Sequence, residues 1–355
     1  MTRWKVWLYI IAAVVLVSAC GWPAGGRTAA EQERFPVTVA DGQSLSWDYT
    51  DVSQTPGIPG AQLAVVAKEM DLGYWKAVKE GAEQAVDDLN AYYGYEDEDR
   101  IELTFEGSGD GADVEAQVTQ IDAVLAENPS AICIAAVDMA SCTPQLEAAA
   151  DNGIPVIALD SGVESTIPAG SCATDNYTAA MEAAGKLCGA IGDVGKIALV
   201  THTSTSKTAI DRADGFIREL ESHPDIFIAA NLVQNEYESI GTMIESTLTL
   251  HPDLKGIFCT NERTADEVLE AVEKLERTDL AIIGFDAGKV QREAVEEGRE
   301  YGLICQNPRG MGYISVMMAL HAANGDPVDR YVDTGHRWID RDGLADAANS
   351  VFLYD

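Results

Sequence analysis

The chain has 355 residues, of which 46% are hydrophobic and 23% are charged. It is therefore too apolar to be disordered, and its length suggests two domains of about 150 residues each. Acidic residues outnumber basic residues 58 to 24, which gives a formal net charge of −34. So negative a surface repels nucleic-acid phosphates and anionic lipid head groups, so we expect no nucleic acid among the partners.

The first residues have the pattern of an export signal. Arg3 and Lys5 precede an apolar run over residues 6–17, which is shorter than the about 20 residues of a membrane-spanning helix. A basic start, a short apolar run and small residues before a cleavage site are typical of a signal peptide, predicted here over 1–19. Leu16-Val17-Ser18-Ala19-Cys20 resembles a bacterial lipobox. That resemblance implies that Cys20 is lipidated and begins the mature protein; the alternative is an ordinary signal peptide with a coincidental cysteine.

Residues 20–60 are rich in proline and glycine and have no sustained helical or strand period, so we predict a lipid anchor followed by a flexible tether. The remaining cysteines are Cys133, Cys142, Cys172, Cys188, Cys259 and Cys305. An even number in an exported chain permits disulfides, whereas their positions in apolar runs favour buried thiols, and the sequence leaves the pairing open. No C-x-x-C motif occurs and the five histidines are scattered, so no metal site is predicted.

From residue 61 onward, short apolar runs alternate with segments of helical period. Strands are predicted at 62–67, 101–105, 131–135 and 156–159, with helices at 73–93, 114–127 and 144–152 between them. A second series predicts strands at 196–200, 226–233, 256–259, 280–285 and 302–305, separated by helices at 208–222, 239–250, 265–276 and 290–297. This alternation indicates an α/β fold with two doubly wound parallel-sheet, Rossmann-like lobes. Ligands of such sheets bind beyond the carboxyl ends of the strands, where polar and aromatic residues recur in this sequence.

Motifs for catalysis or cofactor binding are weak. The run from Gly107 to Ala112 matches a loose dinucleotide pattern, but Asp110 would repel a pyrophosphate and the run follows the wrong strand, so a flexible turn is the better interpretation. No G-x-S-x-G turn is present, and no histidine accompanies a nucleophile at a strand end. We therefore expect no enzymatic activity and no cofactor.

Nine short stretches, in order, resemble the type I periplasmic solute-binding proteins of bacterial ABC transporters, in the ribose- and galactose-binding branch. They are Gly73-Tyr74-Trp75 with Lys79 to Ala82, Gly153 to Ile157 with Leu159-Asp160, Ala173 to Asn176, Arg212 to Phe216, Asn261-Glu262, Gly284-Phe285-Asp286 and Cys305 to Pro308. The resemblance covers residues 62–338. It implies two lobes joined by a hinge that the chain crosses three times, with a ligand cleft between them. The implied lobes are 61–173 plus 307–332 and 174–306 plus 333–345, followed by a tail over 346–355.

The resemblance also implies the residues that hold the ligand. Tyr74 and Trp75 are expected to stack on it, and Asp160, Asn261, Asp286 and Gln306 to hydrogen-bond its hydroxyls, with Tyr237 as an aromatic of the second lobe. Aromatic rings and carboxylates suit a sugar, which has apolar faces and a rim of hydroxyls. Each candidate has a structural alternative, such as lobe core for the aromatics or a helix cap for Asp286. Arg212 is predicted to form a structural ion pair.

Three positions depart from the sugar-binding pattern. Ser161 and Ile210 stand where the branch commonly has arginine, and Leu72 is nearest to a missing asparagine. The ligand therefore either carries fewer hydroxyls or is held by other residues, for which Lys68, Asp71, Asp138 and Thr205 are the candidates.

The expected function is capture of a small polar solute, a sugar or polyol, by a monomer on the extracytoplasmic face of the cell membrane, held there only by its lipid. The partner implied by the family is an ABC permease. An alternative is a receptor that presents the solute to a sensor kinase or chemoreceptor. A transcription regulator of the same fold is disfavoured because a signal peptide and tether stand where a helix-turn-helix is needed.

Overall fold

The structure is a computed structural model that describes residues 34–235 and 237–355. The predicted signal peptide, Cys20 and the first part of the predicted tether lie outside the described residues. Within the described ranges, no helix combines the length and the apolar character needed to cross a membrane.

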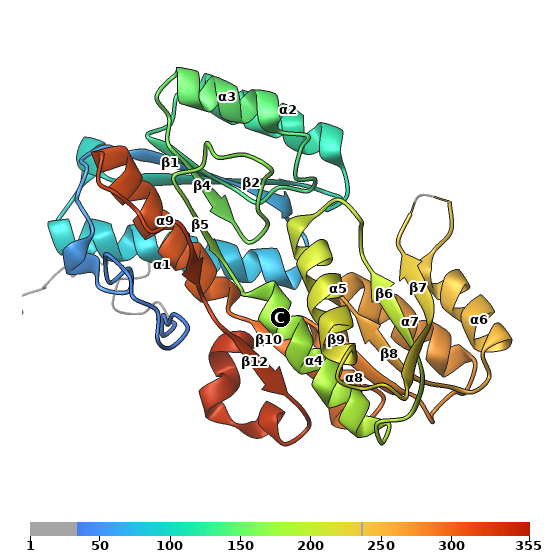
Figure 1. The fold of residues 1–355 in the computed structure, drawn as a ribbon. Coiled ribbons are helices and arrows are strands. Elements are labelled where there is room, and N and C mark those ends of the chain that lie inside the picture. The colour runs from blue at the N-terminus through green and yellow to red at the C-terminus, as the bar shows by residue number, and fades with distance from the viewer. Residues whose placement is uncertain (1–33, 236) are drawn as a thin grey trace, which may run out of the picture. The chain divides into compact units, whose positions relative to one another are not determined.

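The first lobe is a six-stranded parallel sheet with helices on both faces (Figure 1). Its strands, in spatial order, are β11 (Val332–Asp333), β5 (Gly170–Ala173), β4 (Val156–Leu159), β3 (Ala131–Ile134), β1 (Gln62–Glu69) and β2 (Glu102–Ser108). Leu63 and Val65 pack against helices α1 (Gly73–Tyr93) and α9 (Pro308–Asn324), whereas Ala64 and Val66 pack against α2 (Val114–Ala126) and α3 (Thr143–Asp151). Because successive side chains of a strand point to opposite faces, an apolar run is buried on both.

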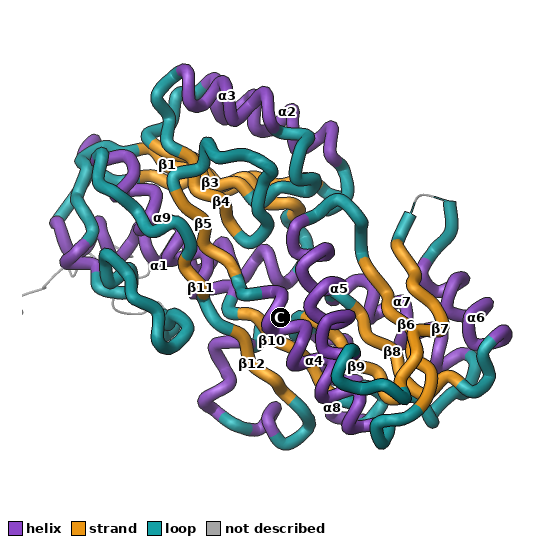
Figure 2. The backbone as a smooth tube through the Cα atoms, viewed as in Figure 1, coloured by secondary structure: helices purple, strands orange, loops and turns teal. Residues whose placement is uncertain are grey.

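The second lobe repeats this arrangement. Its sheet has the order β12 (His336–Ile339), β10 (Gly302–Gln306), β9 (Ala281–Phe285), β8 (Leu254–Cys259), β6 (Gly195–Thr201) and β7 (Ile226–Val233). Ile197 and Leu199 face α4 (Asn176–Ala190) and α5 (Lys207–Leu220), and Ala198 and Val200 face α6 (Ile240–Leu250) and α7 (Glu262–Lys274). Helix α8 (Lys289–Glu297) lies between β9 and β10. Figure 2 shows the two orange sheets, each flanked by purple helices. The prediction of two doubly wound lobes is confirmed.

The chain passes between the two sheets three times, after β5, after β10 and after β11. The last passage differs from the parallel sheets that the sequence predicts, because β12 pairs with β10 in the antiparallel sense. Only Thr334 and Gly335 separate β11 from β12, so the chain passes from the edge of one sheet to the edge of the other without an intervening helix.

Residues 34–60 are packed against the first lobe, so the predicted flexible tether is wrong for this part. Tyr49 is 1% exposed and its hydroxyl is 2.9 Å from an Asp329 carboxylate oxygen. The Gln43 side chain accepts from the Asp333 amide and donates to its carbonyl at 2.8 and 2.6 Å, which satisfies the open edge of β11. Trp47 stacks on His321 at 4.4 Å between ring centroids. These anchors are single, widely spaced side chains, which give the segment no detectable period.

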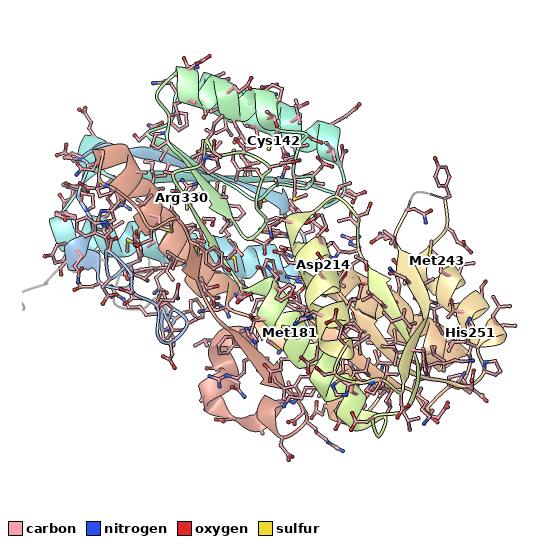
Figure 3. All side chains as sticks on the ribbon, in the orientation of Figure 1. Cys142, Met181, Asp214, Met243, His251 and Arg330 are labelled. Carbon is pink, nitrogen blue, oxygen red and sulfur yellow. The ribbon has the colours of Figure 1, made fainter. Side chains whose placement is uncertain are left out.

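The six cysteines among the described residues are all free and buried. Cys142, labelled in Figure 3, precedes α3, and burial raises the pKa of its thiol. Burial likewise raises the pKa of Cys133 to about 12. Thiols buried in this way are weak nucleophiles. Because all six are free, no disulfide among the described residues cross-links the fold.

Candidate functional site

A pocket of about 160 Å³ lies at the carboxyl ends of strands from both lobes. That volume is below the about 300 Å³ at which drug-sized pockets begin, so it favours a small ligand. Seven of the predicted ligand-binding residues line it, namely Lys68, Tyr74, Trp75, Asp160, Asn261, Asp286 and Gln306. Strand ends of two sheets converge here, which brings together residues that are far apart in the sequence.

Two predicted site residues lie elsewhere. Tyr237 is 88% exposed, in the loop after β7, where its amide donates to the Asn235 side chain. Asp138 accepts hydrogen bonds from the Ala140 and Ser141 amides and from the Ser141 hydroxyl at 2.7–2.9 Å. That carboxylate stabilises its own turn, as aspartate commonly does. Neither side chain lines the pocket of this structure, and contact of either one with a ligand stays a prediction.

Asp160 follows β4 and is 6% exposed, with a φ of 57°. This left-handed conformation is one that aspartate tolerates better than most residues, and such strain is typical of functional sites. The Tyr74 hydroxyl donates to Asp160 Oδ1 at 2.8 Å. Lys68 Nζ lies 3.8 Å from Asp160 Oδ2 and donates to the Ser206 hydroxyl at 3.2 Å. The carboxylate is thus held by one neutral donor and one cation, both from the first lobe.

Asp286 follows β9 in the same manner, with a φ of 82° and 5% exposure. Gln306 donates to Asp286 Oδ1 at 2.6 Å, and the Glu262 amide donates to Oδ2 at 3.2 Å. Burial raises the pKa of Asp286, and the nearby positive charge of Arg212 opposes that rise. The second hydrogen bond places Asp286 at the N-terminus of α7, where a negative charge is favourable.

Lys68, His202 and Arg212 bring basic groups to the pocket. Burial lowers the pKa of Lys68, whereas the Asp160 charge acts to raise it. His202 also lines the pocket, and burial together with the charges of Arg212 and Lys68 holds its pKa well below the usual value. A histidine with so low a pKa is neutral at pH 7, and its Nδ1 lies 2.8 Å from the Thr260 hydroxyl.

Arg212 lines the pocket but does not form the ion pair that the sequence predicts. Its Nε donates to the Asn176 side chain and its Nη1 to the Thr260 carbonyl, both at 2.7 Å, and its guanidinium stacks 3.6 Å from the centre of the Phe285 ring. Arginine suits this position because its flat cation packs on an aromatic face while its edges donate. Arg212 therefore presents a fixed positive charge to the pocket.

The aromatic pair lies where core and pocket meet. Tyr74 and Trp75 are 4% and 5% exposed, and their rings are perpendicular with centroids 5.1 Å apart. Both belong to the hydrophobic core of the first lobe and both line the pocket. Asn261 likewise has two roles. It lines the pocket, and its side chain accepts from the Thr264 amide at 3.0 Å and so caps α7.

Several pocket residues are not among the ligand contacts predicted from the sequence. Glu69 and Arg263 come from different lobes and form an ion pair of 2.6 Å at the rim. Thr203, Ser206 and Thr208 contribute hydroxyls before and within the first turn of α5. His202 follows strand β6 directly, so its place at a carboxyl end was a usable signal. Glu69 and Arg263 gave no signal, because charged residues at those positions are equally typical of a solvated surface.

Among residues 34–235 and 237–355, no cluster of three or more His, Cys, Asp or Glu side chains is arranged to hold a metal ion. Asp71, a candidate substitute for the missing family residues, does not line the pocket, whereas Thr205 does. Ser161 is fully buried, and its hydroxyl lies 3.0 Å from that of Ser206 in the other lobe.

Comparisons with known proteins agree with this geometry. Residues 63–327 match the family model described as a periplasmic binding protein domain. The chain is 26% identical to a xylitol-binding protein of Mycolicibacterium smegmatis over 60% of this chain and 61% of that protein. It is 24% identical to a D-apiose import binding protein of Actinobacillus succinogenes over 66% of this chain and 73% of that protein. An ABC transporter solute-binding protein of Agrobacterium vitis, solved with α-D-tagatopyranose, superimposes with a TM-score of 0.76 and 26% identity, over 83% of this chain and 99% of that one.

Proposed function

Because this chain belongs to the periplasmic binding protein family, we propose that it captures a small, neutral, polyhydroxylated molecule, a sugar or a polyol, between its two lobes. The observation that carries the proposal is the pair of buried carboxylates, Asp160 and Asp286, which face one pocket from different lobes. A carboxylate accepts from two hydroxyls at once, and such charge-assisted hydrogen bonds are stronger than neutral ones.

The remaining lining groups complement a sugar. Lys68, Arg212 and Asn261 supply donors for ligand oxygens, and Trp75 supplies an apolar face. Four acidic and three basic side chains line the pocket, so their charges nearly cancel: Glu69, Asp110, Asp160 and Asp286 against Lys68, Arg212 and Arg263. A ligand with a full charge would disturb this balance, whereas hydroxyls serve both signs. The relatives named after xylitol and D-apiose, both neutral and hydroxyl-rich, support the same class.

Binding and release, without covalent chemistry, is the proposed action. The ligand enters while the lobes are apart, and its hydroxyls then join carboxylates that belong to different lobes. Leaving one buried partner without a hydrogen bond costs about 1–3 kcal/mol, so a molecule that lacks one hydroxyl is rejected. The three chain passages between the sheets are the proposed hinge.

Delivery to an ABC importer and lipid anchoring complete the proposal. The family match and the import role in the name of the apiose-binding relative support the first. The lipobox-like run that ends at Cys20 supports the second. We expect Cys20→Ala to move the exported protein from the membrane pellet to the soluble fraction, and a variant that stays in the pellet would contradict anchoring at this residue.

A thermal-shift screen tests the ligand class. Neutral pentoses, hexoses and pentitols are compared with the matching sugar acids, amino sugars and amino acids, at equal concentration. At least one neutral compound is expected to raise the melting temperature, since a ligand that binds only the folded state stabilises it. A response confined to charged compounds would overturn the proposal.

A further inference from the structure

Residues 346–355, which the sequence assigns to a tail, pack against residues that line or support the binding pocket. A short 3₁₀ helix, η4 (Ala347–Phe352), leads into a segment that places Tyr354 between the lobes. The Tyr354 side chain is 3% exposed and joins the hydrophobic core that contains Tyr74 of the first lobe and Ala287 of the second.

On the side of the second lobe, Tyr354 contacts Ala287, which follows Asp286 in the chain, and Glu262, which lies next to Asp286 in space. The Ala287 amide donates to the Tyr354 hydroxyl oxygen at 3.0 Å, and that hydroxyl in turn donates to Glu262 Oε2 at 3.4 Å. The Glu262 amide is itself a donor to Asp286 Oδ2. The Tyr354 hydroxyl therefore bonds the Asp286 turn directly at Ala287, and it bonds the side chain of Glu262, the residue whose amide donates to the Asp286 carboxylate.

On the side of the first lobe, the ring of Tyr354 meets Tyr74. Their rings are nearly perpendicular at 76°, with centroids 6.0 Å apart, a favourable edge-to-face arrangement. The Tyr74 hydroxyl is the neutral donor to Asp160. One side chain thus contacts the supports of both pocket carboxylates.

Two glycines leave space for the C-terminal segment and for the Glu262 side chain that it contacts. A Cβ on Gly73, the first residue of α1, would lie 2.7 Å from the Asp355 carbonyl oxygen, and a Cβ on Gly288 would collide with the Glu262 carboxyl group. The Leu353 carbonyl accepts from Arg309 Nη1 at 2.8 Å, and Asp355 pairs with Arg292. Arg309 belongs to the first lobe and Arg292 to the second, so the segment is fastened to both.

We propose that Tyr354 is a positioning residue of the binding pocket, which orders the Asp286 turn through its hydroxyl and seats Tyr74 against Asp160 through its ring. The proposal rests on the proposed function for its effect on ligand, whereas its effect on the turn is measurable without any ligand.

A consequence for protonation follows from the Glu262 contact. Burial raises the pKa of Glu262 to about 8, the charges of Asp286, Asp266 and Glu69 add to the rise, and the hydrogen bond from Tyr354 opposes it. Glu69 is also paired with Arg263, the basic residue beside Glu262. Loss of the Tyr354 hydroxyl is therefore expected to raise the pKa of Glu262 further.

The test uses the full chain and Tyr354→Phe, which keeps the ring and removes only the hydroxyl. Hydrogen exchange of the Ala287 amide, measured by NMR without ligand, is expected to accelerate about 10-fold because its buried acceptor is lost. The Glu262 carboxyl resonance is expected to titrate at higher pH than in the wild type. Tyr301→Phe, at a residue 51% exposed, is the control and leaves both unchanged. Unaltered exchange and an unaltered Glu262 titration in Tyr354→Phe would overturn the proposal.

A second variant tests the contact between the C-terminal segment and the first lobe. Gly73→Ala displaces residues 354–355 without altering a pocket side chain, and Gly185→Ala in α4, where nothing lies within 4 Å of the added Cβ, is its control. Calorimetry with the neutral sugar that stabilises the wild type most is expected to show about 3- to 10-fold weaker binding for Tyr354→Phe and Gly73→Ala only. Unchanged affinity in both would overturn the positioning role. If no neutral sugar binds the wild type, the proposed function fails, and the exchange and titration results still decide whether Tyr354 orders the turn.

Discussion

Each lobe places one aspartate with a positive φ at the pocket, and these two aspartates share a backbone conformation but have different partners. Asp160 follows β4 and Asp286 follows β9, each the third strand in the spatial order of its sheet. Both residues have a positive φ, and both donate their amide to the neighbouring strand at 2.8 Å. Asp160 has the ammonium group of Lys68 at 3.8 Å. Asp286 is held instead by the Gln306 amide and by a backbone amide.

This difference shows that the repeated fold fixes where a carboxylate stands but not its electrostatic environment. The strand end and the left-handed turn recur in both lobes because the topology recurs. The neighbours come from other elements and are free to differ. Both carboxylates are buried. The first lobe therefore contributes Asp160, an acceptor paired with a cation, and the second contributes Asp286, an acceptor held by neutral hydrogen-bond donors.

Removal of the cation is expected to have the largest effect. Lys68→Met leaves the Asp160 carboxylate, whose side chain is 6% exposed, without its counter-ion. Breaking a buried ion pair in this way lowers the free energy of unfolding by about 3 kcal/mol. Lys196→Met is the matched control, because Lys196 and Asp253 form an exposed pair, 42% and 62% accessible, worth less than about 1 kcal/mol. Equal losses in urea unfolding would show that Lys68 is no more than a surface charge.

The second lobe is tested through Glu262, whose pKa of about 8 exceeds its ordinary value of 4.5. Between these values the folded protein holds a proton that the unfolded chain has released, so stability falls as pH rises across the window. The slope is at most about 1.4 kcal/mol per pH unit. Glu262→Gln is expected to flatten the fall between pH 5 and 8 in thermal unfolding, whereas Glu273→Gln on the exposed face of α7 keeps it. A variant as steep as the wild type would refute this assignment.

The shared backbone conformation predicts an unusual order of stability. At Asp286, alanine is strained by the φ of 82° and glycine is not, so Asp286→Ala is expected to be less stable than Asp286→Gly by about 1 kcal/mol. Asp160 is expected to behave alike. At Asp214, an exposed position in α5 labelled in Figure 3, alanine is expected to exceed glycine by about 1 kcal/mol. The usual order at Asp286 would count against a strained turn.

The smallest effect is expected at the rim. Arg263→Gln removes the bridge to Glu69 across the pocket mouth, but the Arg263 side chain is 43% exposed. Exposed pairs contribute less than about 1 kcal/mol and are screened by salt. The loss of ligand affinity is expected to be about 2-fold at low salt and to vanish at high salt. A salt-independent loss would indicate direct contact between Arg263 and the ligand.

The sequence predicts most of the architecture because apolar runs and helical periods mark elements that are buried on definite faces. It does not predict α9, in which every residue from Pro308 to His321 except Arg309 is buried, since no polar face remains to give a period. The strands β5, β11 and β12 are missed because they carry no continuous apolar run, unlike β3 and β4, which are as short but entirely apolar.

The pocket is predicted where a residue lies at the end of a strand or directly after it, as for Lys68 and Asp160, because topology alone brings strand ends together. The rule fails where a loop turns away, as it does before Tyr237, and where a carboxylate stabilises its own turn, as at Asp138. It also gives no sign of Tyr354, which reaches the site from a segment without any strand end. Such contacts depend on how distant segments pack, which no local pattern encodes.

The central claim is that one neutral, polyhydroxylated ligand is held by carboxylates of both lobes. Calorimetric titration of the wild type, Asp160→Asn and Asp286→Asn with the same neutral sugar tests it most directly, because asparagine tolerates the left-handed turn and keeps the side-chain size. Each substitution is expected to weaken binding by about 10-fold or more, the effect of losing a hydrogen bond to a charged group. Wild-type affinity in either variant would show that its lobe does not hold the ligand through that carboxylate and would contradict the account.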